Sequence, residues 1–486
     1  MENTKKSSLR ELHGARLYGY SMGFFGIMLM FMLTGSYSYT FYVYTIRLDS
    51  ILVSIGSTLS MVTMGFSSII FGVILDNTKP KKIGKRRPYI LIALPLWLIP
   101  TILGYLPPWL PPKALAMSST VLYWPTAIWY WVVSIVRAIF SSLLMIVFSS
   151  ILPEISQTLN NRKKVATLSA NLTVLSSIIG TSFPIIIQSL VEDSRNTGYW
   201  TNSGKFIMNV MPAISIIFGI LVSILIIIAF FSIDESFHLK GSEFEKKKIK
   251  DTFKGLFIPV KDKEYMKVMA AGVTTQMSQF TLSYTIIPFI AFVLGRNLSP
   301  AQISSFYIFY IIIRILTNFI WLYIWKRLMQ KQGNLLKTYK LNLIFMIFGA
   351  FLEFLFFFNL TVTLRLILFV LSFGTVLGSM YATALFNQPI LNEMVDRAAD
   401  IYLIDNTQKS LNKDQAVTLL SGAYNGLMMF AASIVGAFSS IIYGFIFQGE
   451  NSTNPVILTI GLMFMGFFQI VALGLLQLFK VKFKES

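Results

Sequence analysis

Cysteine is absent from this sequence, and histidine occurs only twice, as His13 and His238. Without thiols there is no disulfide framework, no thiolate metal site and no cysteine nucleophile. Two histidines also exclude a metal centre built from several imidazoles. Charged residues make up only 13% of the 486 residues, about half the share found in soluble domains. We therefore expect neither a bound metal nor a cofactor.

Long apolar runs take the place of the missing charge. Hydrophobic residues make up 55% of the chain, and its mean hydropathy is +0.65. Many runs exceed the roughly 18 residues that mark a membrane-spanning helix, which excludes a soluble enzyme, a secreted scaffold and a disordered chain. Within a bilayer every backbone polar group must be satisfied internally, so such runs predict helices. Twelve are expected, at about 17–45, 51–75, 88–107, 119–152, 164–190, 206–232, 266–293, 302–325, 338–358, 363–392, 415–447 and 455–479.

The excess of basic residues, which gives a net charge of +19, follows the topology of these spans. If the N-terminus is cytoplasmic, 33 of the 41 Lys and Arg residues fall in segments on the inner side of the membrane. Six fall in outer loops, and only Arg137 and Arg314 lie within helices. This bias places both termini in the cytoplasm. The charge is therefore expected to meet anionic lipid headgroups, and no nucleic-acid partner is predicted.

A hydrophilic segment in the middle of the chain divides the spans into six and six. Two similar stretches support an internal repeat: Ile-Leu-Pro-Glu154 after the fourth span and Ile-Leu-Asn-Glu393 after the tenth. Parallel repeats of this kind are a recurrent construction of transporters. The predicted organisation is a cytoplasmic tail at 1–16, a six-helix half at 17–232, a cytoplasmic loop at 233–265, a second half at 266–479 and a tail at 480–486.

The loop between the second and third spans carries the most specific local pattern. Asp76-Asn-Thr78 is followed by Gly84-Lys-Arg86-Arg87-Pro-Tyr-Ile-Leu, a tight turn with a basic cluster beside a helix that opens with proline. This pattern resembles the same loop in the major facilitator superfamily, and most closely the glycoside–pentoside–hexuronide:cation symporters and related sucrose carriers. Weaker similarities run over most of the chain.

This resemblance implies a carrier whose two six-helix halves tilt about one central site. In such carriers, charged groups at the cytoplasmic face hold one state closed. Carried over to this sequence, the candidate cytoplasmic gate charges are Asp76, Arg86, Arg87, Glu154, Arg162, Glu393 and Arg397.

The second span departs from the family in a way that affects the coupling ion. Sodium-coupled members carry two aspartates one helical turn apart here, whereas this sequence offers only hydroxyl groups at Ser67 and Ser68. Hard cations prefer several oxygen ligands with anionic charge among them. A proton is therefore favoured over sodium as the coupling ion, and uniport or the exchange of anions remains open.

Arg137 and Arg314 are the strongest candidates for contact with a substrate. An arginine at mid-membrane depth costs about 3 kcal/mol or more, so it usually faces a cavity or a partner. One arginine comes from each half, and the pair could clamp an anionic group; in the alternative interpretation each binds only helix carbonyls or neighbouring polar groups. Further candidates are aromatic and amide side chains on the expected inner helices: Tyr37, Tyr130, Trp131, Gln276, Gln279, Tyr310, Asn318, Tyr424 and Asn425.

Glu353 is the only acid placed well inside a predicted span. It lies near the outer end of the ninth span, where we expect it to extend toward the membrane surface. The alternative is a role in proton relay.

Together these features predict an all-α protein of the cell membrane with twelve helices in two halves, acting as a monomer. The expected function is secondary active or facilitative transport of a small polar solute, such as a sugar, glycoside or hexuronide-like anion. A carrier for lysolipids or other amphiphiles and a transport-inactive sensor remain as alternatives. A membrane enzyme is disfavoured, although Glu393 and Asp396 could share one helix face.

Overall fold

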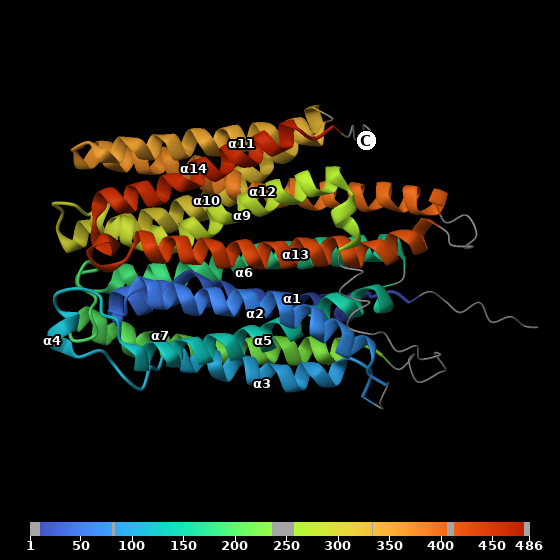
Figure 1. The fold of residues 1–486 in the computed structure, drawn as a ribbon, viewed down its shortest axis with the longest axis horizontal. Coiled ribbons are helices and arrows are strands. Elements are labelled where there is room, and N and C mark those ends of the chain that lie inside the picture. Colours follow the sequence, from blue (N-terminus) through green and yellow to red (C-terminus); the bar gives the residue numbers. More distant parts are fainter. Residues whose placement is uncertain are drawn as a thin grey trace, which may run out of the picture.

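The computed structural model describes residues 10–79, 83–156, 158–235, 257–332, 334–405 and 413–480. Long helices that run side by side make up nearly all of it (Figure 1), and no β-strand forms among these residues beyond isolated bridges. Eleven helices are long and apolar enough to cross a membrane. The chain is thus an all-α, multi-pass membrane protein.

The first group of helices packs mainly within itself, and we call it the N-half. It contains α1 (Gly14–Thr40) with its π-helical continuation η1 (Phe41–Thr45), α2 (Ser50–Asp76), α3 (Arg87–Leu103), the short α4 (Lys113–Ala116), α5 (Trp124–Ile155), α6 (Leu159–Leu190) and α7 (Asn202–Ser232).

The second group, the C-half, has the same character. It contains the 3₁₀-helix η3 (Ile258–Lys261), α9 (Lys263–Pro288) with the π-helix η4 (Phe289–Leu294), α10 (Pro300–Gln332), α11 (Leu335–Leu352) with the 3₁₀-helix η5 (Glu353–Phe357), α12 (Val362–Asp405), α13 (Lys413–Ile446), the 3₁₀-helix η6 (Gly449–Thr453) and α14 (Pro455–Gln477).

These helices begin where the sequence supplies capping groups. Side-chain oxygens of Asp49, Thr201 and Asn454 accept hydrogen bonds from the first free backbone N–H groups of α2, α7 and α14, which have no partner within their own helix. Pro88 and Pro455 stand in the first turns of α3 and α14, where proline fits because its missing N–H is not needed.

Two helices continue well past the apolar runs that predict them. The tenth predicted span ends at residue 392, whereas α12 continues to Asp405, and α10 continues to Gln332 rather than 325. Neither extension contains proline or glycine, so the backbone stays helical after hydrophobicity ends. By contrast, α3 is shorter than its predicted span: it has only 17 residues, fewer than the 18 required of a membrane-spanning helix. The twelfth span therefore stays a prediction.

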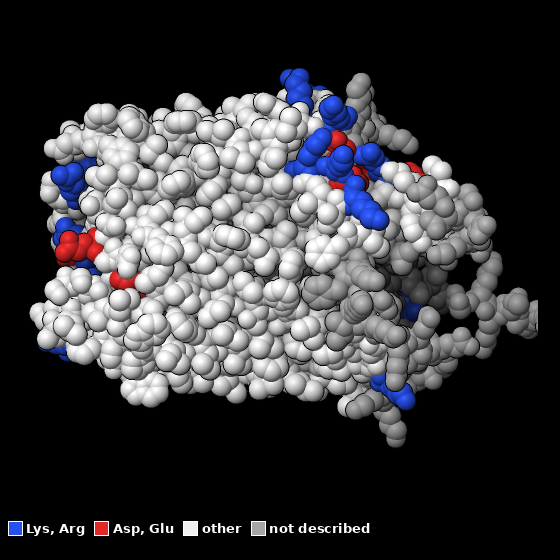
Figure 2. Space-filling model, in the orientation of Figure 1, with Lys and Arg blue, Asp and Glu red and all other residues white. Residues whose placement is uncertain are grey.

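Charged side chains gather at the two ends of the bundle. Figure 2 shows a broad band without them between clusters at either end, as expected for a surface that faces lipid. Helix α1 begins and α14 ends at the same end (Figure 1). We call this the inner end, because the positive-inside bias predicts that it faces the cytoplasm, and the opposite end the outer end.

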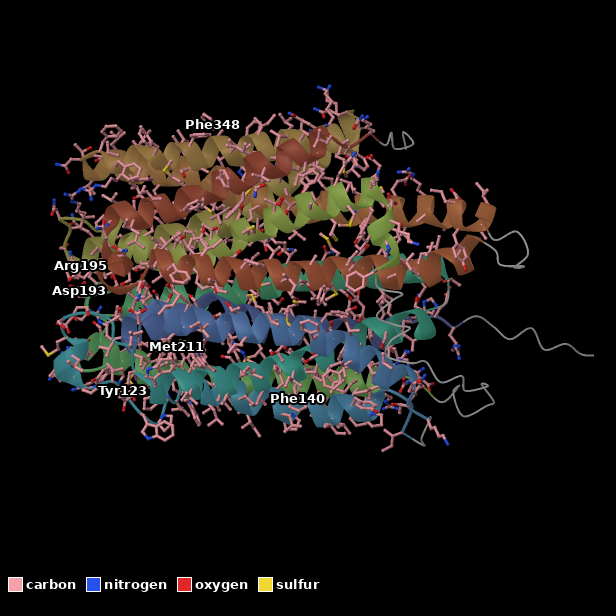
Figure 3. All side chains as sticks on the ribbon, in the orientation of Figure 1. Tyr123, Phe140, Asp193, Arg195, Met211 and Phe348 are labelled. Carbon is pink, nitrogen blue, oxygen red and sulfur yellow. The ribbon has the colours of Figure 1, made fainter. Side chains whose placement is uncertain are left out.

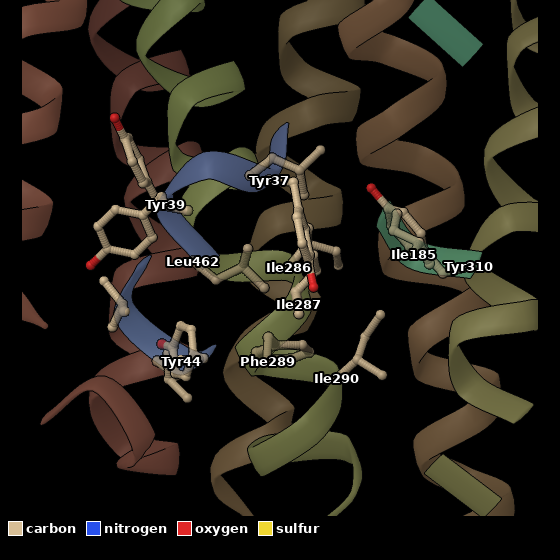
Figure 4. Packing of buried hydrophobic residues seen from close by; sticks show 14 of the residues in the cluster. Tyr37, Tyr39, Tyr44, Ile185, Ile286, Ile287, Phe289, Ile290, Tyr310 and Leu462 are labelled. Carbon is tan, nitrogen blue, oxygen red and sulfur yellow. The ribbon is translucent and has the colours of Figure 1, made fainter. Parts of the chain in front are cut away.

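Hydrophobic packing differs between the two ends. At the outer end one cluster of buried residues, the outer cluster, draws on both halves, with Tyr37 of α1, Ile185 of α6 and Tyr310 of α10 among its members. In Figure 4 the outer part of α1 and η1 lies beside segments of the C-half. Toward the inner end the core divides into one N-half cluster and one C-half cluster, which shares only Ile69 with the N-half. The halves are therefore joined at the outer end.

Matching irregularities mark the outer ends of α1 and α9. Both helices end in a π-helix, η1 and η4, at which the backbone turn is wider than in an α-helix. A non-glycine residue with positive φ follows each: Arg47 at 65° and Asn297 at 60°. The first helix of each half therefore ends in the same way.

Candidate functional site

The two intramembrane arginines lie at the same depth in opposite halves. Arg137 is 13 residues beyond Trp124, the first residue of α5, and Arg314 is 14 residues beyond Pro300, the first residue of α10. Both helices start at the outer end (Figure 1). At a rise of 1.5 Å per residue, each arginine lies about 20 Å below that end.

Arg137 is half-buried and faces hydroxyl groups. Its Nη1 atom lies 3.5 Å from Ser38 Oγ on α1, and the phenol groups of Tyr42 and Tyr105 are near enough to interact with its charge. Among the described residues, no aspartate or glutamate forms an ion pair with it. The guanidinium thus brings a positive charge to mid-depth without an acidic partner in the part of the chain that the structure describes.

Arg314 is almost fully buried, in a polar stripe along α10. Tyr307 donates a hydrogen bond to the carbonyl of Ile287 at 3.0 Å. The Asn318 side-chain amide donates to the Arg314 carbonyl at 3.1 Å, and its Oδ1 atom has no partner among the described residues. Tyr310 packs against aromatic rings of α12. Tyr307, Tyr310, Arg314 and Asn318 are all buried and therefore share one face of α10.

Tyr37 and Tyr130 lie on the outer side of the arginines and are fully buried. The Tyr37 hydroxyl accepts a hydrogen bond from Gln188 Nε2 at 2.7 Å. The Tyr130 hydroxyl lies 3.0 Å from Ser57 Oγ, and its ring packs at 4.3 Å on that of Tyr42. Ten of the 21 tyrosines belong to the outer cluster, so the arginines lie beneath a layer of aromatic rings that carry hydroxyl groups.

The remaining predicted candidates separate into two sets. Gln276 and Gln279 on α9 are half-buried and make no side-chain hydrogen bond to a described residue, so their amides are available. Trp131 donates to the Leu52 carbonyl at 2.8 Å and packs against Trp124, which makes it a packing residue. The last two candidates belong to the inner part of the C-half, away from the outer cluster: the Tyr424 ring packs edge-on against Tyr265, and Asn425 donates to Ser421.

Polar contacts close the outer end between the halves, and we call these contacts the outer latch. Tyr44 donates to the Ser452 carbonyl at 2.7 Å, Ser50 to the Gly444 carbonyl at 2.7 Å and Thr58 to the Ala437 carbonyl at 3.0 Å. Asp49 Oδ2 accepts from the Gly449 backbone N–H at 3.3 Å. Each bond joins the N-half to α13 or η6 of the C-half.

A second contact closes the outer end beside the latch. Arg195 and Asp193 lie together there (Figure 3) and form an ion pair at 3.2 Å. Arg195 Nη1 also donates to the Leu298 carbonyl of the C-half at 3.2 Å. The sequence indicates none of these pairings, because most of the partners are backbone atoms.

At the inner end, the hydrogen bonds and ion pairs that join one described residue to another stay within one half. The side chains of Asp76, Glu154 and Arg162 lie outside the described residues. Arg397 on α12 is close enough to Glu264 and Tyr424 of the same half to affect their charges, and Glu393 is half-buried on the same helix. The predicted inner gate therefore stays a prediction, and it applies to the state in which the inner end is closed.

The segment before α1 is fastened to the start of α6 at the inner end. Asn161 Oδ1 accepts from the Leu12 backbone N–H at 2.9 Å, and its Nδ2 donates to the Leu12 carbonyl at 2.8 Å. Thr158 donates a hydrogen bond to the Glu11 carboxylate, which holds the pKa of Glu11 below its usual value. All these contacts stay within the N-half.

The loop after α2 is held by Glu235, a residue that the sequence analysis does not single out. Its carboxylate accepts from the backbone N–H of Arg86 at 2.9 and 3.1 Å and from that of Arg87 at 3.0 Å. The Arg86 side chain donates to the Ser150 carbonyl at 2.7 Å. Gly84 has φ 121°, and a Cβ atom there would lie 2.3 Å from Glu235 Oε2. The predicted gate arginines are thus bound within the N-half in this state.

Replacing Glu235 with alanine should destabilise the protein. Two backbone N–H groups, those of Arg86 and Arg87, would lose their acceptor, and an unsatisfied buried group costs about 1–3 kcal/mol. Thermal unfolding of the detergent-purified variant should show a lower Tm than the wild type. Asp234→Ala is the matched control, because Asp234 is exposed and pairs with Arg16 at 3.7 Å, a contact that contributes little. An equal effect of both variants would contradict the role of Glu235.

Glu353 differs from the expectation that it extends toward the membrane surface. The side chain is fully buried, because α11 ends at Leu352 and the following 3₁₀ turn directs Glu353 toward Ser372 of α12. The prediction was therefore wrong.

Two groups of membrane helices that close at one end over buried cationic and polar side chains define a secondary transporter. The model of the family described as MFS/sugar transport protein matches residues 19–397. The chain belongs to this family of the major facilitator superfamily, and it is a transporter of small polar solutes rather than an enzyme.

Solved structures agree on the fold. The nucleoside transporter NupG is 15% identical, with a TM-score of 0.57, over 97% of this chain and 100% of that one. The D-xylose–proton symporter is 12% identical, with a TM-score of 0.58, over 97% and 98% of the two chains. A bacterial homologue of the human lysosomal transporter Spinster, in an inward-facing and unoccupied conformation, is 11% identical, with a TM-score of 0.56 over 95% of both chains. No curated protein matches the sequence.

Proposed function

We propose that the transported solute is a small hydroxylated anion of the sugar type, such as a hexuronide, held between Arg137 and Arg314. The observation that carries this proposal is the position of the two arginines at one depth in opposite halves, with no acidic partner for Arg137 among the described residues. A carboxylate bound there would accept hydrogen bonds from both guanidiniums and offset one of their two positive charges at mid-membrane depth. The half-buried amides of Gln276 and Gln279 offer donors and acceptors for sugar hydroxyls.

The coupling ion in this proposal is a proton. The stretch of α2 around Ser67 and Ser68 offers no carboxylate to sodium, and the Ser68 hydroxyl donates to the Gly65 carbonyl of its own helix at 2.7 Å. The chain is expected to work as a monomer, since the closed outer end is formed entirely by its own two halves.

The test is uptake of labelled phenyl glucuronide and of its neutral analogue, phenyl glucoside, into proteoliposomes, with imposed proton or sodium gradients. The glucuronide should be preferred and driven by the proton gradient. Arg137→Ala should reduce its uptake by about 10- to 100-fold, because a hydrogen bond to a charged group contributes about 1.5–3 kcal/mol. The exposed Arg327, whose guanidinium lies over Tyr323, provides the control Arg327→Ala. Equal loss in both variants, or preference for the glucoside, would contradict the anion site.

A further inference from the structure

Glu353 is a buried acid that the transport site does not use. Its side chain has no exposed surface. Elements of the C-half enclose it, namely α11, α12 and α14 around η5. Its nearest polar neighbour is Ser372 of α12, whose Oγ atom lies 3.3 Å from Glu353 Oε1 and 2.9 Å from the Gly349 carbonyl. The second carboxyl oxygen, Oε2, has no hydrogen-bond partner among the described residues.

The hydroxyl of Ser372 cannot satisfy both neighbours if Glu353 is ionised. A hydroxyl has one hydrogen, and both the Gly349 carbonyl and a carboxylate would require it. If Glu353 carries a proton, its O–H donates to Ser372 Oγ, and Ser372 donates to the Gly349 carbonyl. The geometry then leaves one neutral carbonyl oxygen unpaired instead of a buried anion, whose desolvation would be far more costly.

No cation is placed to compensate a charge on Glu353. The elements α14 and η4 contain no ionisable side chain. The basic residues of α11, Lys337 and Lys340, lie in its first turns at the inner end. On α12 the nearest cation is Arg365, two turns before Ser372, and its guanidinium donates to the carbonyls of Leu360, Leu294 and Arg296.

We propose that Glu353 is a proton-binding site, and that a proton taken from the outer aqueous phase stabilises the outer-closed arrangement. The step is the addition of one proton to the carboxylate, to give the neutral acid seen enclosed here. Four residues of η5 and a short loop separate Glu353 from the outer end of α12, so protons arrive from that side. The proposal does not depend on which solute is carried.

Aromatic contacts link the site to closure of the outer end. Phe356 of η5 packs on Phe289 of η4 with ring centroids 5.4 Å apart, and Phe289 packs on Phe373 at 5.8 Å. In the same π-helix, Phe292 contacts Tyr44 of the N-half at 6.2 Å. Ionisation of Glu353 would require water beside η5, which would separate Phe356 from Phe289. The support for η4, against which the N-half closes, would then weaken.

The absence of cysteine makes a direct test straightforward. Ser54 is fully buried at the closed outer end, beside Gly444 of α13, so Ser54→Cys supplies a single thiol that is reached only when the outer end opens. Its labelling by a membrane-impermeant maleimide would be measured in proteoliposomes at different external pH values. Dividing each rate by that of Ser118→Cys, at an exposed outer position, removes the intrinsic pH dependence of the reaction.

Labelling should increase by about tenfold between acidic and alkaline external pH if the proton binds ten times more tightly to the outer-closed state. Glu353→Gln, which mimics the neutral acid, should keep labelling at its acidic value throughout. Ser372→Ala, which removes the partner, should raise labelling at acidic pH. An unchanged pH response in Glu353→Gln would overturn the proposal and assign the response to another acid, such as Asp49. The proposal would also be overturned if labelling of Ser54→Cys did not change with pH while Glu353 is present.

Discussion

Valine in place of Gly444 is expected to abolish transport while both halves remain folded. Gly444 lies where α13 crosses α2 at the outer latch, and a Cβ atom there would be 2.5 Å from Ser54 Cβ and 2.6 Å from Ser54 Oγ. The Ser50 hydroxyl binds the carbonyl of the same residue. A larger side chain would therefore hold the two helices apart. Since alternating access requires this contact to form once per cycle, the chain would remain open at the outer end.

The measurements are solute uptake and maleimide labelling of Ser54→Cys in the same background. Uptake should fall below detection, and labelling should become fast and insensitive to pH. Gly422→Val is the matched control on the same helix, because no atom lies within 4 Å of the Cβ position there. If Gly444→Val transported normally, the α2–α13 contact would not be part of the cycle.

The second large effect is expected for Asp49→Ala. This carboxylate accepts from the Ile51 backbone N–H at 3.0 Å, which caps α2, from Thr120 Oγ1 at 3.1 Å and from the Gly449 N–H of the C-half. Only the last of these bonds depends on closure of the outer end. A hydrogen bond to a charged group contributes about 1.5–3 kcal/mol, so its loss should shift the equilibrium toward the outer-open state by about 10- to 100-fold.

Labelling of Ser54→Cys would measure this shift directly. Asp49→Asn should keep the cap through its one side-chain oxygen but change the labelling as Asp49→Ala does, because its amide nitrogen cannot accept from the Gly449 N–H. Glu450→Ala serves as the control, since Glu450 is an exposed acid of the neighbouring η6. If Asp49→Ala lowers thermal stability without changing the labelling rate, the residue only caps α2.

The helices were largely predictable because apolar runs and helix caps are local signals. The two arginines inside the membrane spans were predictable too, since charged residues stand out in segments of this hydrophobicity. The repeat around Glu154 and Glu393 corresponds to equivalent places in the structure, 30 residues after the start of α5 and 31 after the start of α12.

The latch could not be predicted, for a physical reason. Tyr44 and Ser452 are 408 residues apart in the chain, and Asp49 and Gly449 are 400 apart. Their acceptors and donors are mostly backbone groups, which every residue carries, so no pattern of complementary side chains marks the pairs. The burial of Glu353 was missed for a related reason, since the 3₁₀ turn that reorients it leaves no trace in hydropathy.

The paired π-helices at the ends of α1 and α9 bear on the ancestry of the chain. A π-turn is a helix that holds one extra residue, and the same extra residue at the same place in both halves is most simply explained if it preceded a duplication. Aligning the equivalent helices of the two halves from their first residues places Thr375 of α12 opposite Arg137, and Met64 of α2 opposite Arg314. The two arginines therefore stand on helices that are not counterparts. The duplicated scaffold is symmetric, but the site that we propose between the arginines is asymmetric.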